Sequence, residues 1–275
     1  MECKLVDVLK LKLNPVAIIF TDDKPEDAMQ FREGKWGCVM MLFSQAARGK
    51  TAVFDRGTFG CFGGGTGLGF GNQYHSFNGG INCFYRFLSS GNVADEKGQK
   101  VGEEAKEYLR GESYDNFMYG EGYVKSPELV KKFVDKLPII DVPTKYVMFK
   151  PLKDLDEKED EPKVIVFTVN PDQLSALTVL ANYDRESFDN VYAPFAAGCQ
   201  SIGIMAYNEM DKENPRAVIG LTDISARTYS TRQLGKDALT FAVPIKMFHE
   251  MESNIEGSFL EKHTWKKLVK MNMEQ

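Results

Sequence analysis

The sequence has few features of nucleic-acid-binding, membrane or secreted proteins. Its 275 residues carry a net charge of −5, so they offer no basic field to neutralise a run of phosphates, and nucleic acid is not expected as a partner. The apolar run near the amino terminus, residues 16–20, is too short for a signal peptide or a membrane span. We therefore expect no membrane association and predict a cytoplasmic protein.

Cysteine and histidine are also scarce. The chain has five cysteines at irregular spacing and three histidines, and it contains no C-x-x-C pair. An odd number of cysteines in such a chain favours reduced thiols or metal ligands over a disulfide framework. With 43% hydrophobic and 27% charged residues, however, the chain has the composition of an ordinary folded protein.

Apolar periodicity and turn residues predict alternating helices and strands. Helices are expected near both termini, from Cys38 to Gly49, over 79–88, 102–109 and 127–137, from Pro171 and after Cys199. Strands are expected at 16–20, 51–54, 146–151, 164–169, 217–221 and 239–243. The spacing across the acidic turn DLDEKEDEP predicts that 146–151 and 164–169 form a hairpin.

An internal repeat appears when residues 14–72 are laid beside residues 162–230. The first segment contains VAIIFTDD, GCVMMLFSQAARG and TAVFD, and the second contains VIVFTVNP, GCQSIGIMAYNEM and RAVIGL in the same order. The alternative is that the similarity arose by chance, because the alternation of strands and helices is common. The repeat predicts an α+β fold of two related strand-helix-strand halves packed about a pseudo-twofold axis. A helical insertion over 79–137 and a terminal helix over 245–272 complete a single compact domain, 1–275.

The repeat brings four side chains into correspondence. Cys38 and Cys199 each follow a glycine at a predicted helix start, while Cys61 and Asp223 each follow a predicted strand. A helix start favours a thiolate and lowers the pKa of a cysteine there. If the halves pack about a pseudo-twofold axis, the four side chains converge, with sulfurs within roughly 8 Å of each other.

Three thiolates and a carboxylate suit either a Zn²⁺ ion or an iron–sulfur cluster with one ligand that is not cysteine. The predicted metal ligands are therefore Cys38, Cys61, Cys199 and Asp223. The absence of C-x-x-C spacing weakens the prediction, and the alternative is that these cysteines are buried as small apolar residues.

A second candidate is the glycine-rich segment CFGGGTGLGFGN, expected to be a loop. Its residues Gly63, Gly64, Gly65 and Gly67 would let backbone amides approach a cofactor or an anion. The segment has neither the Walker pattern nor the G-x-G-x-x-G register, so nucleotide binding is not favoured. A small organic ligand held by this loop and its aromatic neighbours is the metal-free alternative, and a plain glycine turn is the structural one.

Other polar residues give weaker indications. His75 is the histidine closest in sequence to Cys61, which leaves thiol hydrolysis as a minor alternative. Arg227 would bind the carboxylate of a ligand or pair with a surface acid. No catalytic residue and no reaction follow from these residues.

The set NPVAIIF, the Cys38 helix ending in AARG, Cys61 before its glycines, Cys199 and the ISAR segment ending at Arg227 resembles the domain-of-unknown-function family 169 of archaea and bacteria. The resemblance implies a shared architecture and cysteines at the three positions named. It also implies that many members have a fourth cysteine where Asp223 stands here, so a four-cysteine site is not expected in this chain and a mixed ligand set is the alternative. The family name implies no reaction.

These observations lead to two expectations for function. The first is a cytoplasmic protein that binds a metal ion or an iron–sulfur cluster between two halves, for redox chemistry or cofactor handling with a small molecule or a redox partner. The second is a metal-free small-molecule-binding module built on the glycine-rich segment. The oligomeric state does not follow from the sequence.

Overall fold

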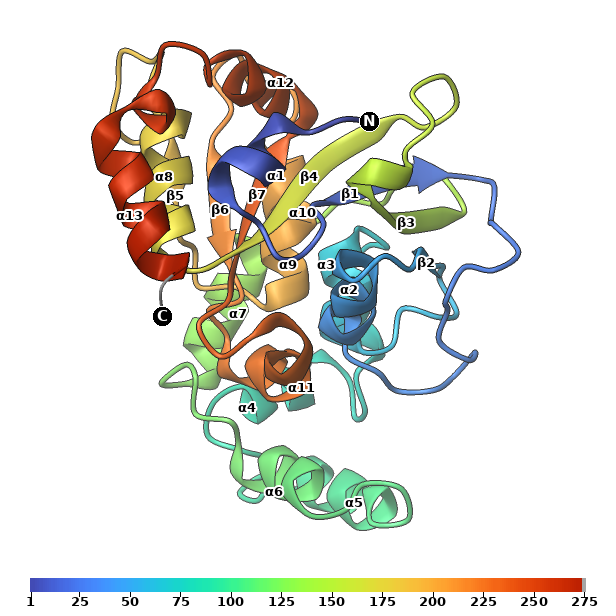
Figure 1. The fold of residues 1–275 in the computed structure, drawn as a ribbon. Coiled ribbons are helices and arrows are strands. Elements are labelled where there is room, and N and C mark those ends of the chain that lie inside the picture. The colour runs from blue at the N-terminus through green and yellow to red at the C-terminus, as the bar shows by residue number, and fades with distance from the viewer. Residues whose placement is uncertain (274–275) are drawn as a thin grey trace. The chain divides into compact units, whose positions relative to one another are not determined.

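The computed structural model describes residues 1–273, and these fall into two compact units (Figure 1). Unit 1 comprises residues 1–70 and the chain from 140 onward, and unit 2 comprises residues 71–139. The prediction of a single compact domain concerns how the two units sit together, and it stays a prediction. The fold is mixed α+β, as predicted.

Unit 1 holds all the strands described. Its elements are α1 Lys4–Leu9, β1 Val16–Thr21, α2 Val39–Ala47, β2 Ala52–Phe54, α3 Phe62–Leu68, β3 Tyr146–Pro151, η2 Leu152–Asp154, β4 Pro162–Val169, α8 Pro171–Ala181, β5 Val191–Tyr192, α9 Gly198–Ile202, α10 Ile204–Tyr207, β6 Ala217–Gly220, α11 Ile224–Leu234, β7 Leu239–Pro244, α12 Ile245–Ser253, η3 Phe259–Glu261 and α13 His263–Met273. The predicted strands are thus confirmed, and β5 is an additional strand.

The seven strands form one sheet in the order β2-β3-β1-β4-β7-β6-β5. Neighbouring strands are antiparallel except for β5 and β6. The predicted hairpin of β3 and β4 is wrong, because β1 lies between them and pairs with both. The length of a turn constrains only the pairing of the two strands that it connects, whereas β1 precedes β3 by more than a hundred residues.

The sheet is buried on both faces, which explains the unbroken apolar runs of its strands. Alternate residues of the central strands, such as Ala17 and Ile19, join a core with α1, α8, α12 and α13. The opposite face packs under α2 and α10. There the ring of Phe43 lies 6.0 Å from that of Phe149, and the ring of Phe20 lies 4.9 Å from that of Tyr207.

The pairing register is the same on the two sides of the β1/β4 pair. Val16 lies opposite Pro151 in β3, and Val164 lies opposite Pro244 in β7. Farther out, β2 pairs with β3 as β6 pairs with β7. The central pair sets Ala17 against Ile165, with Val16 opposite Val166 and Ile18 opposite Val164.

Local signals explain where the helices of unit 1 begin and end. Asn170 and Gln173 form a reciprocal capping box at the start of α8, with Pro171 at the first position. The predicted terminal helix over 245–272 is wrong in one respect, because it is interrupted between α12 and α13. Gly257 has a φ of +77° there, and a helix cannot continue through that conformation.

Unit 2 is helical, as predicted for residues 79–137. Its elements are η1 Gln73–Ser76, α4 Ile81–Phe87, α5 Glu96–Ala105, α6 Glu112–Tyr119 and α7 Pro127–Asp135. Aromatic rings form its core, with Tyr74 stacked 3.9 Å from Phe84 and Phe77 stacked 6.1 Å from Phe117. The buried Asn92 amide joins the carbonyls of Cys83 and Phe117, at 3.1 and 2.9 Å.

None of the helices in residues 1–273 combines the length and the apolar character needed to cross a bilayer.

Candidate functional site

Two of the predicted ligands, Cys38 and Cys61, are the N-cap residues of α2 and α3. The Cys61 sulfur accepts a hydrogen bond of 3.2 Å from the amide of Gly64. The backbones before the two cysteines touch, because a Cβ built on Gly60 would lie 2.2 Å from the carbonyl oxygen of Gly37. This contact requires glycine at position 60, and it places the two cysteines on neighbouring segments.

The third predicted ligand, Cys199, lies in the first turn of α9, as expected. Its thiol donates a hydrogen bond of 3.2 Å to the carbonyl oxygen of Gly63. That carbonyl belongs to the same peptide group as the Gly64 amide, which donates to Cys61. One peptide group therefore lies between the sulfurs of Cys61 and Cys199.

The separation of these two sulfurs follows from the shared peptide. The two hydrogen bonds measure 3.2 Å each, and the oxygen and nitrogen of a peptide lie about 2.3 Å apart, so the sulfurs of Cys61 and Cys199 are at most about 9 Å apart. The N–H and C=O bonds of a trans peptide point in opposite directions. As the thiols stand, the sulfurs are on opposite sides of the peptide, farther apart than a single Zn²⁺ ion at about 2.3 Å from each would require.

Asp223 joins the starts of two helices. As the N-cap of α11 it accepts a 2.6 Å hydrogen bond from the Ala226 amide through Oδ1. Its Oδ2 accepts a second hydrogen bond from the amide of Gly198, the first residue of α9 and the neighbour of Cys199. Both carboxylate oxygens are thus bound to backbone amides, so Asp223 has a structural role in addition to any part as a ligand.

The four groups influence each other's protonation. Burial, then the charge of Cys61, raises the pKa of Cys38 to about 12. Burial also raises the pKa of Cys199 well above its usual value, followed by the charges of Cys61, Cys38 and Asp223. Burial raises the pKa of Asp223 as well, against the lowering effect of its two amide donors. The predicted lowering of the cysteine pKa values at the helix starts is therefore wrong for Cys38 and Cys199, because desolvation and mutual repulsion outweigh the helix dipole.

The glycine-rich segment is a helix, and its prediction as a loop is wrong. Gly63, Gly64, Gly65 and Gly67 all lie in α3, whose amides bond within the helix, such as that of Gly65 to the Cys61 carbonyl at 2.9 Å.

The glycines of α3 permit close packing against α9. A Cβ on Gly67 would lie 2.8 Å from the amide nitrogen of Gln200, and one on Gly203 would lie 1.9 Å from the carbonyl oxygen of Gly67. Neighbouring protein atoms thus fill the space beside Gly67, and ligand binding near Gly63, Gly64 and Gly65 stays a prediction.

Arg227 is bound to main-chain carbonyls. Its guanidinium donates to Leu221 at 3.2 Å, to Ala238 at 2.8 Å and to Lys236. Leu221 has a φ of +60°, a conformation that is uncommon for leucine. Arg227 therefore braces the segment before Asp223 and the return to β7, and its binding of a ligand carboxylate stays a prediction.

The remaining cysteines, Cys3 and Cys83, and His75 lie on other elements of the chain. Cys83 and His75 are in unit 2, where Cys83 is buried. The Cys3 thiol donates to Glu252 at 3.2 Å, at the start of α1. The cysteine site is thus built within unit 1 from α2, α3, α9 and α11, of which α2 packs against α11 and α3 against α9 (Figure 1).

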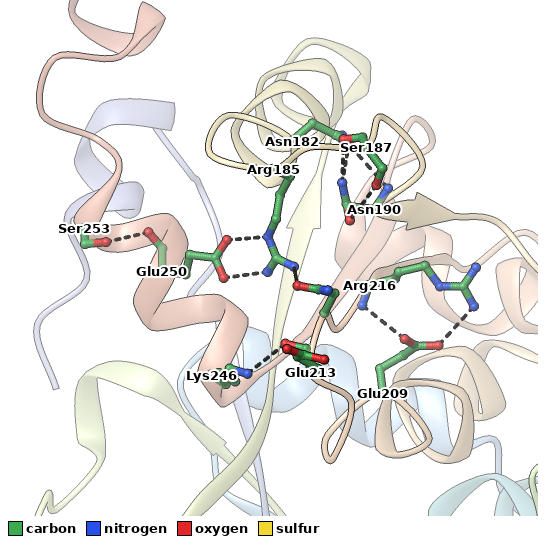
Figure 2. Close-up of polar contacts among 11 residues, drawn as sticks. Asn182, Arg185, Ser187, Asn190, Glu209, Glu213, Arg216, Lys246, Glu250 and Ser253 are labelled. Carbon is green, nitrogen blue, oxygen red and sulfur yellow. Dashed lines mark hydrogen bonds and ion pairs between the residues drawn. The ribbon is translucent and has the colours of Figure 1, made fainter.

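A second polar region of unit 1 is occupied by ion pairs (Figure 2). Arg185 forms a two-point pair with Glu250, at 2.5 Å for both bonds, and the buried Glu209 pairs with Arg216 at 3.2 Å. A cavity of about 470 Å³ borders Arg185, and Asn214 also lines it. None of the predicted site residues lines this cavity.

One residue of the cysteine site was missed in the sequence. Tyr207 is buried, and the charge of Cys199 contributes to raising the pKa of its phenol, after burial. The sequence gives no local signal for it, because Gly203, with φ −101° and ψ −110°, separates α10 from α9.

Within residues 1–273, no three His, Cys, Asp or Glu side chains stand in an arrangement that would hold a metal ion. The sequence model of the DUF169 family, described as uncharacterised ArCR, matches residues 4–254. No curated protein and no solved structure matches the chain significantly.

Proposed function

The chain belongs to the DUF169 family of uncharacterised proteins, and on this premise we propose that it binds an iron–sulfur cluster or a metal ion through Cys38, Cys61 and Cys199. The observation that carries the proposal is the position of the sulfurs. Cys61 and Cys199 bond to the two ends of one peptide group, and Cys38 follows a segment in contact with the one before Cys61.

The repeated register supports the idea of two related halves. In the strand order, exchanging β1 with β4 also exchanges β3 with β7 and β2 with β6, and the pairing registers match. Under this exchange the α2 start corresponds to that of α9, and the α3 start to that of α11. Cys38 thus pairs with Cys199, and Cys61 with Asp223, as a duplicated site would require.

The chemistry of the donors favours thiophilic metals. A thiol must lose its proton to bind a metal, so metal binding at buried thiols of high pKa releases protons. The hydrogen bond from Cys199 to the Gly63 carbonyl depends on that proton. Loss of the proton frees the Cys199 side chain to turn towards Cys61.

The spacing favours a cluster over a single ion. A polynuclear iron–sulfur cluster carries its cysteine ligands on different iron atoms, so the sulfurs can lie farther apart than around one Zn²⁺ ion. Asp223 is then the candidate for a fourth ligand, at the cost of its hydrogen bonds to Gly198 and Ala226. Electron transfer or handling of an organic cofactor, with a small molecule or a redox partner, is the role we assign to such a centre.

Anaerobic purification tests this function. We expect iron and acid-labile sulfide with a broad visible absorption in the wild-type chain, or stoichiometric zinc without colour. The Cys199→Ser variant should lose the metal, whereas Cys83→Ser, a change to a buried cysteine of unit 2, should retain it. A wild-type protein free of iron and zinc after this handling would refute the proposal and support the metal-free alternative.

A further inference from the structure

Two threonines on one face of the sheet have buried hydroxyls without a partner. Thr168 in β4 is 7% exposed and Thr240 in β7 is fully buried, and no atom of the described residues hydrogen-bonds either Oγ1. A buried hydroxyl without a partner costs free energy, whereas a valine has nearly the same shape and avoids that cost. The two positions therefore indicate that the hydroxyls bind something.

The two threonines face each other across the β4/β7 pair. Thr168 lies directly opposite Thr240, and Thr240 lies opposite Gly220 in β6. Directly opposite residues direct their side chains to the same face of a sheet. Their neighbours Phe167 and Phe241 belong to the core on the other face, with α1, α8, α12 and α13. The hydroxyls therefore point to the face where α9 packs on β6 and β7.

A third hydroxyl, that of Ser201 in α9, reaches this position from the helix. A Cβ built on Gly220 would lie 1.9 Å from Oγ of Ser201 and 2.7 Å from Oγ1 of Thr240. The space thus requires glycine at position 220, and the two oxygens are close enough for one water molecule to contact both. Ser201 donates its own proton to the Gly198 carbonyl at 2.8 Å, so its oxygen can act as an acceptor.

We propose that an ordered water molecule binds between Thr168, Thr240 and Ser201. It accepts hydrogen bonds from the two threonine hydroxyls and donates one to the serine oxygen. Buried waters typically make about three hydrogen bonds to groups that have no other partner. Three neutral hydroxyls supply no charge to balance a buried ion, which favours water as the occupant. The water joins β4 and β7 to α9, and the inference is independent of metal binding.

Urea denaturation of valine variants tests this bridge. Thr168→Val and Thr240→Val should each lower the equilibrium constant of folding about fivefold, because each removes a hydrogen bond to the water. The double variant should lower it by less than the product of the two effects, because either single variant already breaks the bridge. If the hydroxyls bind nothing, both valines should raise the constant instead.

Ser201→Ala measures the third contact, and Ser44→Ala is its matched control. Both serines are buried and donate to the carbonyl three residues earlier in their helices, at 2.8 and 2.6 Å. Only Ser201 also contacts the proposed water, so Ser201→Ala should lower the equilibrium constant about fivefold more than Ser44→Ala. Equal effects of the two variants would overturn the three-way bridge.

A crystal structure at a resolution that shows ordered waters identifies the occupant directly. The inference predicts density within hydrogen-bonding distance, about 2.5–3.0 Å, of the oxygens of Thr168, Thr240 and Ser201. No density between the three oxygens, or a direct hydrogen bond between the two threonines, would overturn it. Stabilisation by either valine substitution would refute it as well.

Discussion

Replacing Asp223 by alanine removes two hydrogen bonds at the starts of two helices. Asp223 accepts from the backbone amides of Ala226, at 2.6 Å, and Gly198. A hydrogen bond to a charged group contributes about 1.5–3 kcal/mol. The desolvation that raises the Asp223 pKa offsets part of this sum, so we expect Asp223→Ala to lower the free energy of unfolding by about 3 kcal/mol.

Urea denaturation of metal-free protein measures this effect. Both tryptophans, Trp36 and Trp265, belong to unit 1, so tryptophan fluorescence follows the unit that contains Asp223. The control is Asn170→Ala. It removes the neutral cap of α8, a side-chain oxygen that accepts one 2.9 Å hydrogen bond from the backbone amide of Gln173. Such a cap contributes about 1 kcal/mol.

The ratio of the two effects decides the role of Asp223. The variant Asp223→Asn keeps one acceptor oxygen, and we expect its loss of stability to lie between those of Asp223→Ala and Asn170→Ala. If Asp223→Ala costs no more than Asn170→Ala, the carboxylate does not join the two helices, and our reading of its geometry is refuted.

Three further substitutions test separate parts of the structure. Gly67→Ala forces a Cβ against the Gln200 backbone, so it should lower the free energy of unfolding, measured in urea, by more than about 2 kcal/mol. The control Gly57→Ala, whose Cβ would have its nearest contact at 3.4 Å, should change it by no more than about 0.5 kcal/mol. Equal effects of the two variants would refute the close packing of α3. Lys10 has a φ of +54°, so Lys10→Gly should raise the thermal midpoint, and a lower midpoint would contradict this strain. Burial and Glu252 raise the pKa of Cys3 to about 12, so its stabilising contribution is complete below pH 9 and is lost as the pH rises towards 12. In urea titrations at pH 8 and pH 11, wild type should therefore lose more stability than Cys3→Ala, and parallel losses would contradict the shift.

The strands could be predicted from the sequence because the sheet is covered on both faces. Each central strand is then an apolar run between turn residues, such as residues 16–20. Their order could not be predicted in full, because it depends on contacts between distant segments. The insertion of β1 between β3 and β4 leaves no signal in the turn that connects them.

The glycine-rich segment shows how tertiary packing overrides local propensity. Each glycine within a helix costs about 1 kcal/mol relative to alanine, so the sequence favours a loop. In the fold, Gly67 and Gly203 allow α3 and α9 to approach until backbone meets backbone. No local pattern in either segment indicates the other as its partner.

The four predicted ligands were chosen from the repeat, which aligns Cys38 with Cys199 and Cys61 with Asp223 in the sequence. The sequence could not show that Asp223 also holds two helices together, because its second donor, Gly198, lies on another helix. Nor could it identify Tyr207, because a buried hydroxyl without a partner is visible only in the folded chain.

The most direct test of the metal centre is X-ray absorption at the iron edge of anaerobically reconstituted protein. Convergence of Cys38, Cys61 and Cys199 on a cluster predicts a first shell of sulfur at about 2.3 Å, a typical metal–sulfur distance. It also predicts scattering from neighbouring iron, and both signals should be lost in Cys199→Ser and kept in Cys83→Ser. A first shell of oxygen and nitrogen alone, or spectra that do not change in Cys199→Ser, would contradict the central claim.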